Sequence, residues 1–208
     1  MPASLRTNDG IRRGGKQYES IHTALAQGSA LELAAVGYGD FSPEAVAERV
    51  GVSPRTAFRH YETKLALALA GIHSLPTYKG WLDGVEPEES MADRLRRGIR
   101  TGMDYFSLVA YISATALSYR DTQPELVEAL KKHVLIPRHR AIAQFLEEGQ
   151  RSGVLRSDVE ASALAAADLG LFTMVALGQF KLGRGETRVT RMFRQYWPLM
   201  ATSAHLDD

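Results

Sequence analysis

Four side chains that can donate hydrogen bonds follow one another closely near position 57. They are Arg55, Thr56, Arg59 and His60. Guanidinium, hydroxyl and imidazole groups suit the phosphates and base edges of nucleic acid. Ala57, Tyr61 and Leu65 recur at intervals of four and predict the inward stripe of a helix. The four polar side chains lie outside that stripe, so they are expected to face solvent or a partner.

A second short helix is predicted just before this one. Ser42 can cap its first amides, and Pro43 fits the first helical position because its missing N–H is not needed there. Gly51 allows the left-handed backbone of a tight turn, after which Ser53 and Pro54 restart a helix. This spacing fits a DNA-reading helix-turn-helix. It fits equally a plain helical hairpin with solvated arginines.

The run GYGDFSPEAVAERVGVSPRTAFRHYETK, residues 37–64, resembles the signature of the tetracycline-repressor (TetR) family of bacterial transcription regulators. The resemblance lies in Gly37 and Tyr38, in Ser42, Val46 and Ala47, in Gly51, Val52 and Ser53 at the turn, and in His60, Tyr61 and Lys64. It implies phosphate contacts from Ser42, His60 and Lys64. It also implies that the rest of the chain forms a larger helical domain.

Within such a motif, Arg55 and Thr56 near the start of the second helix are expected to reach base edges, and Arg59 either bases or phosphates. Phosphate contacts are expected from Ser42, Ser53, His60 and Lys64. Where the family usually carries a tyrosine that donates to a DNA phosphate, this chain has Phe58. That hydrogen bond is unavailable, and Phe58 is expected to turn partly inward beside the small Ala57.

Residues 1–15 are expected to form a flexible basic arm. Residues 1–16 contain four basic residues, Arg6, Arg12, Arg13 and Lys16, and a single acidic residue, Asp9. Arg12 and Arg13 are placed to enter a minor groove or to follow phosphates. A tail with incidental charge fits the same composition.

No long segment alternates with period two, so the predicted fold is all-α with about nine helices. A helix-turn-helix DNA-binding domain is expected at 16–74, and a larger C-terminal ligand-sensing and dimerisation domain at 75–208. Pro, Gly and acidic residues cluster at 75–89 and mark the boundary. Further helices are predicted at 16–35, 63–75, 90–106, 108–119, 125–149, 158–180 and 186–204, with kinks at Pro137 and Pro198.

The last two long helices carry an apolar stripe and a run of small residues. The TetR resemblance implies that they pair with their symmetry mates as a four-helix bundle, although a monomer's core would show the same pattern. The residues expected at this interface are Leu164, Leu171, Val175, Val189, Met192, Phe193, Tyr196, Trp197 and Met200.

The resemblance also implies an apolar effector cavity in the larger domain. Its expected lining is Trp81, Met103, Tyr105, Tyr111, Phe145 and Phe172. Asp168 stands alone as a carboxylate in the stretch LAAADLGLF. A contact with the ligand and a solvated helix position explain it about equally well.

Composition excludes most catalytic chemistry. The 208 residues include no cysteine, 25 basic and 24 acidic residues, and a net charge of +1. Glu-x-x-His occurs once, at Glu19 and His22, whereas a di-iron carboxylate site needs two such pairs; His-Glu-x-x-His, P-loop and dinucleotide-binding patterns are missing. Neither a signal peptide nor an uncharged run long enough to span a bilayer occurs. We therefore expect no catalytic residues, no cofactor, no metal and no membrane contact, and a cytoplasmic location.

The sequence as a whole predicts a TetR-like transcriptional regulator, a repressor by the family's usual mode. It is expected to bind palindromic double-stranded operator DNA as a homodimer and to be released by a small-molecule effector. The alternatives are a structural DNA-binding protein that senses nothing, and a helical-bundle enzyme.

Overall fold

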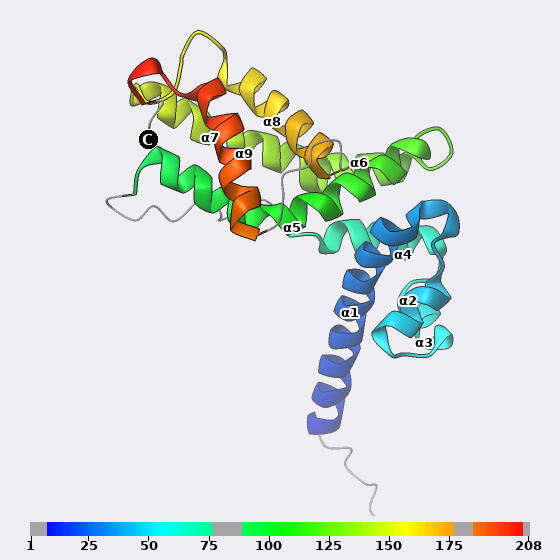
Figure 1. Ribbon diagram of the computed structural model, residues 1–208. Helices are drawn as coiled ribbons and strands as arrows, with labels where there is room; N and C mark the ends of the chain where they lie inside the picture. Colours follow the sequence, from blue (N-terminus) through cyan, green and yellow to red (C-terminus); the bar gives the residue numbers. More distant parts are fainter. Residues whose placement is uncertain (1–7, 77–88, 177–184, 206–208) are drawn as a thin grey trace, which may run out of the picture. The chain divides into compact units, whose positions relative to one another are not determined.

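The computed structural model describes residues 8–76, 89–176 and 185–205, with side chains described at 15–76, 89–100, 108–170 and 190–205. These residues form helices joined by turns, and the one strand-like pairing among them is an isolated bridge between Leu155 and Ala201 (Figure 1). The all-α prediction is confirmed. The chain divides into two compact units, Met1–Leu75 (unit 1) and Pro76–Asp208 (unit 2).

Unit 1 contains the two predicted short helices between two longer ones. The helices are α1 (Asn8–Asp40), α2 (Pro43–Val50), α3 (Pro54–His60) and α4 (Lys64–Ser74). Since α1 begins at Asn8, Arg12 and Arg13 belong to a helix and not to the flexible arm that the sequence suggested; their side chains lie outside the described ones. Gly37, with φ of 73°, interrupts the helical path near the end of α1.

The crossing of α1 over α4 holds unit 1 together. A Cβ on Gly71 would lie 2.6 Å from Ser29 Oγ and 2.9 Å from the backbone N of Ala30, so only glycine permits this approach. The Ser29 hydroxyl donates to the Leu67 carbonyl at 2.8 Å, and the Ser74 hydroxyl donates to the Ala26 carbonyl at 3.2 Å. Neutral hydrogen bonds therefore join two helices that are already in close contact.

Unit 2 consists of longer helices. They are α5 (Met91–Ser118), α6 (Pro124–Leu130), a π-helical turn η1 (Lys131–Leu135), α7 (Ile136–Arg151), α8 (Ala161–Ala176), α9 (Gly185–Met200) and a short 3-10 turn η2 (Ser203–His205). Two helices were expected at 90–106 and 108–119, whereas α5 runs through both without a break. Helix α5 packs against α6, α8 and α9, and α7 packs against α8.

The distortion expected at Pro137 takes the form of the π-helical turn. The Ile136 N–H donates to the Lys131 carbonyl, five residues back. Proline lacks an N–H and its ring crowds the preceding turn, so a widened turn accommodates it without ending the helix. Pro198 lies inside α9, which ends two residues later at Met200.

The apolar stripe of α9 packs inside the chain itself. Met192, Phe193, Tyr196, Trp197 and Met200 are all between 0% and 6% exposed and join the core that α5 and α7 line. A side chain buried within its own chain cannot also present a surface to a second copy. The expectation that these five residues form the dimer interface is therefore wrong, and the monomer-core alternative holds for them.

Candidate nucleic-acid interface

The junction of α2 and α3 has the caps that the sequence predicted. The Ser42 hydroxyl accepts from Ala45 N at 3.0 Å, and Ser53 accepts from Thr56 N at 3.1 Å. Gly51 ends α2 with φ of 76°, and its N–H bonds to carbonyls of the last turn. Each cap satisfies backbone groups that the helix leaves open, so these residue types fix where both helices begin and end.

The outward face of α3 carries two cations and an aromatic ring. Arg55, Phe58 and Arg59 are exposed, at spacings of three and four that place them on one side of the helix. Thr56 is half-buried, and its hydroxyl lies 2.9 Å from Ser53 Oγ. The structure therefore keeps Arg55 and Arg59 together, as expected, and adds Phe58 to the same face.

Phe58 departs from its expected position. The sequence suggested that it turns partly inward beside Ala57, yet 39% of Phe58 is exposed and Ala57 is 1% exposed. Ala57 reaches the interior of unit 1 directly because the surrounding helices close on it.

His60 also departs from its expected position, in the opposite direction. It is 8% exposed, and its ring stacks on Tyr18 of α1 with centroids 4.1 Å apart. Neither ring nitrogen has a hydrogen-bond partner among the described residues. Burial lowers the pKa of His60, and the nearby His22 and Arg59 lower it further. The expectation that His60 faces solvent is wrong: its ring packs from α3 against α1. Its expected contact with a phosphate stays a prediction.

Lys64 contacts the chain's own backbone. Its ammonium donates to the Gly39 carbonyl at 3.0 Å and lies 4.9 Å from the centroid of the Tyr38 ring. Lys64 therefore ties the start of α4 to the end of α1, beside the N-terminus of α2. Its expected contact with a phosphate stays a prediction.

Two contacts that sequence reasoning missed support α2 and α3 from α1. Arg49 donates to the Glu32 carboxylate at 2.6 Å, and the Tyr61 hydroxyl donates to the His22 carbonyl at 3.1 Å. Glu32 is 7% exposed, whereas its apolar neighbour Leu31 is 50% exposed. A glutamate at helical spacing from buried Leu25 and Gly28 was the available signal.

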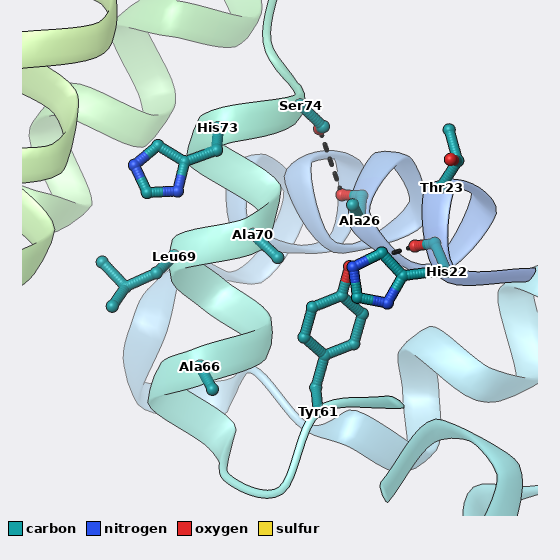
Figure 2. Close-up of a pocket in the computed structure, with 9 residues that line it drawn as sticks. All are labelled: His22, Thr23, Ala26, Tyr61, Ala66, Leu69, Ala70, His73 and Ser74. Carbon is teal, nitrogen blue, oxygen red and sulfur yellow. Dashed lines mark hydrogen bonds between the residues drawn. The ribbon is translucent and has the colours of Figure 1, made fainter. Parts of the chain in front are cut away.

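An open pocket of about 590 Å³ lies in unit 1 between α1, α4 and Tyr61. Its lining consists of His22, Thr23, Ala26, Tyr61, Ala66, Leu69, Ala70, His73 and Ser74. Figure 2 shows the His22 ring beside that of Tyr61, and their centroids are 4.5 Å apart. The sequence did not predict this pocket, because its residues come from three separate segments and share no motif.

The expected effector residues do not come together in the described part of unit 2. Phe145 is 4% exposed in the core, with the Arg94 guanidinium 5.2 Å from its ring centroid, whereas Tyr111 is 47% exposed. Leu164, expected at the dimer interface, is partly buried against the same core. The remaining expected residues lie outside the described side chains: Trp81, Met103, Tyr105, Phe172, Leu171, Val175 and Val189.

Asp168 of α8 does not lie at a solvated position. It is 1% exposed, and Arg138 of α7 donates to its carboxylate at 2.5 Å. Burial raises the pKa of Asp168, while the positive charge of Arg138 acts in the opposite direction. The solvated alternative is therefore wrong, and the carboxylate is part of a buried ion pair between α7 and α8.

Two other kinds of site were tested over the described residues. Nowhere among them do three or more His, Cys, Asp or Glu side chains gather in a way that could hold a metal ion. None of the described helices is both long and apolar enough to cross a bilayer.

The candidate site of unit 1 is a capped pair of short helices, α2 and α3, and the second helix exposes two arginines. This pair of helices has the geometry of a helix-turn-helix.

Comparison with known proteins supports the same class. Residues 28–70 match the family model of bacterial regulatory proteins, tetR family. The chain is similar to the regulatory protein TetR from Rhodobacter sphaeroides (21% identity, TM-score 0.67, 86% of this chain and 98% of that one). It is also similar to a tetR-family regulatory protein from Rhodococcus RHA1 (20% identity, TM-score 0.64, covering 88% and 98%).

A third similar structure is the fatty acid degradation regulator FadR from Bacillus halodurans (13% identity, TM-score 0.64, covering 86% and 93%). No curated protein matches the chain significantly. Residues 28–70 thus match the DNA-binding segment of the tetR family, and the chain shares the fold of these solved tetR-family proteins.

Proposed function

We propose that this regulator represses transcription by binding a palindromic DNA site as a homodimer, and that a small molecule bound in unit 2 releases it. The observation that carries the proposal is the outward face of α3, where Arg55 and Arg59 stand exposed on a helix that Ser53 caps. Guanidinium groups bind guanine edges and phosphates. Ser42 and Ser53 are the further candidates for phosphate contacts.

The homodimer follows from the limits of one recognition helix. A single helix contacts only a few bases, and each good pair contributes about 1–3 kcal/mol of discrimination. Two copies, about 34–36 Å apart on successive major grooves, add their contributions. Because the apolar stripe of α9 is internal, we assign the contact to the exposed side of α8. Its residues are Ala163, Ala166, Ala167 and Gly170, which share one helical face and permit close packing.

The DNA-reading role is tested by selecting sites from random DNA with the full-length chain and then measuring affinity for selected and scrambled sequences. Arg55→Ala and Thr56→Ala should weaken binding to the selected site about 10-fold or more, with a smaller effect on scrambled DNA. Arg140→Ala removes an exposed arginine of α7 and serves as the control. Equal losses on both DNAs would contradict base reading by Arg55 and Thr56.

The dimer is tested by sedimentation of the full-length chain. Ala166→Arg places a charged side chain on the exposed side of α8 and should yield monomers that bind the selected site far more weakly. Gln144→Arg adds the same charge on an exposed position of α7 and should leave the dimer intact. A monomeric native chain with tight, sequence-selective binding would contradict the proposal.

The effector role rests on the size of unit 2, which spans 133 of the 208 residues if counted from Pro76 to Asp208. That exceeds what dimerisation requires. An effector that binds one dimer geometry some 10- to 100-fold better than the other would shift DNA occupancy appreciably. Small-molecule libraries screened for release of the selected DNA test this role. A regulator that no compound class releases would instead fit the non-sensing alternative.

A further inference from the structure

Phe58 is one of four exposed large apolar side chains in the described part of unit 1; the other three, Tyr18, Leu31 and Val36, belong to α1. Within the described residues 41–76 it is the one large apolar side chain that is exposed, with 39% of its surface accessible. It lies between Arg55 and Arg59 on the outward face of α3. Burying an aromatic ring is favourable, so a ring left in solvent among cations is a candidate contact with a partner.

The structure of α3 holds Phe58 on this face. Ala57, 1% exposed, and His60, 8% exposed, already occupy the inward side. Ser53 accepts from Thr56 N at 3.1 Å and so fixes the start of the helix. Rotation of the helix would break this cap and expose Ala57. The ring of Phe58 is therefore presented together with the two guanidinium groups.

The chemistry of the ring limits what it can recognise. Phenylalanine has no polar atom that could bind a phosphate or the polar edge of a base. In the major groove, the apolar group that a base presents is the C5-methyl of thymine. The flanking arginines favour a polyanion over an apolar protein surface as the partner of this face.

We propose that Phe58 contacts a thymine C5-methyl group and makes the regulator select thymine at one position of each half-site. The inference rests on the proposed DNA-reading function and deepens it. Phe58 thus adds sequence selectivity at the very position where a hydrogen bond to phosphate is unavailable. Arg55 and Arg59 supply the charge that brings the ring to the groove.

The test uses the full-length chain and a site selected from random DNA, with each thymine replaced in turn by deoxyuridine, which removes only the methyl group. Replacement of the contacted thymine in one half-site should weaken native binding about fourfold, the value of roughly one buried methyl group. Phe58→Ala should weaken binding by at least as much, and the same deoxyuridine should then have no further effect.

Two controls separate this contact from other roles. Phe58→Leu keeps an apolar side chain and should keep sensitivity to deoxyuridine, and circular dichroism should show the native helix content for both variants. Three outcomes would overturn the inference: a selected half-site with no preferred thymine, native affinity unchanged by every deoxyuridine, or equal losses for Phe58→Ala on selected and scrambled DNA. The last would assign the ring to the sugar–phosphate backbone.

Failure of the wider proposal would look different. A native chain that selects no DNA sequence overturns both the DNA-reading function and the role of Phe58. Sequence-selective binding that ignores the thymine methyl groups overturns the role of Phe58 alone.

Discussion

Unit 1 and unit 2 satisfy their buried polar side chains in different ways. In unit 1, the hydroxyls of Ser29 and Tyr61 donate to backbone carbonyls of facing segments. Glu32 does pair with Arg49, but the arginine side chain stays 41% exposed. In unit 2, Arg138 and Asp168 form an ion pair whose side chains are 1% and 2% exposed.

This difference bears on how each unit responds to change. A neutral hydrogen bond contributes about 0.5–1.5 kcal/mol, so losing one in unit 1 is a graded loss. Two charges buried together stabilise a fold only while both are present, because removing one leaves the other unpaired in a dry interior. We therefore expect unit 1 to tolerate single changes and unit 2 to depend sharply on one pair.

The largest expected effect comes from breaking that pair. Arg138→Met leaves the Asp168 carboxylate buried without its partner, and the free energy of unfolding should fall by about 3–5 kcal/mol. Chemical denaturation followed by circular dichroism measures the change. The double variant Arg138→Met with Asp168→Leu should recover most of the loss, because an apolar pair needs no partner charge.

Arg140→Met is the matched control, since Arg140 lies two residues further along α7 and is exposed. It should change the free energy of unfolding by less than about 0.5 kcal/mol. If Arg138→Met were as mild as Arg140→Met, the contrast between the two units would not hold.

The second effect concerns the close crossing in unit 1. Gly71→Ala places a methyl group 2.9 Å from the backbone N of Ala30, so α1 and α4 must separate slightly. We expect a loss of about 1–3 kcal/mol. Faster amide hydrogen exchange in α1 and α4 would report it.

Gly15→Ala provides the control within the same unit, because nothing lies within 4 Å of a Cβ there. An alanine in an open helical position should stabilise by about 0.5–1 kcal/mol. If Gly71→Ala lowers the free energy of unfolding while Gly15→Ala raises it, the close approach of the two helices, and not helix propensity, determines the effect at Gly71. If both variants were stabilised, α1 and α4 would be able to move apart at Gly71 at little cost in free energy.

The third effect tests the caps that make the motif readable from sequence. Ser42→Ala removes the acceptor for Ala45 N and should cost about 1 kcal/mol, seen as faster hydrogen exchange in α2. Ser42→Asp keeps a capping oxygen and should retain protection. Equal exchange in Ser42→Ala and the native chain would mean that packing of Val46 and Ala47 alone holds the helix.

These caps explain why the helix-turn-helix was predictable almost residue by residue. Ser42, Gly51 and Ser53 act on backbone groups within a few positions of themselves, so their residue types carry the information locally. Phe58 was expected to turn inward and His60 outward, and the structure shows the reverse. The prediction failed because the sequence does not show how closely α1 approaches α3. Tyr18, which covers His60, is distant from it in sequence.

The sequence predicted that these segments of unit 2 are helical, but it did not predict which surfaces their apolar faces pack against. The stripe of Met192 and Trp197 shows which face of α9 is apolar, and a second copy or the same chain could equally cover it. Arg138 and Asp168 are 30 residues apart on different helices, so no local pattern joins them. Contacts between residues far apart in the sequence determine what covers the apolar face of α9 and which residue pairs with Asp168. A single sequence does not show such contacts.

The smallest expected effect is a pH dependence of unit 1 that depends on His60. Its ring is faced by Tyr18 and His22 from α1 and lies near Arg59 of its own helix, and its pKa in the folded chain lies below the ordinary value of about 6.5. As pH falls below about 6.5, the unfolded chain takes up a proton that the folded chain resists, so unit 1 loses stability.

Hydrogen exchange in α3 at pH 5.5 and pH 7.5, corrected for intrinsic rates, measures this loss. His60→Phe keeps an aromatic ring but cannot titrate, so it should flatten the pH dependence. An equally pH-dependent His60→Phe variant would show that His60 is not the source of the effect.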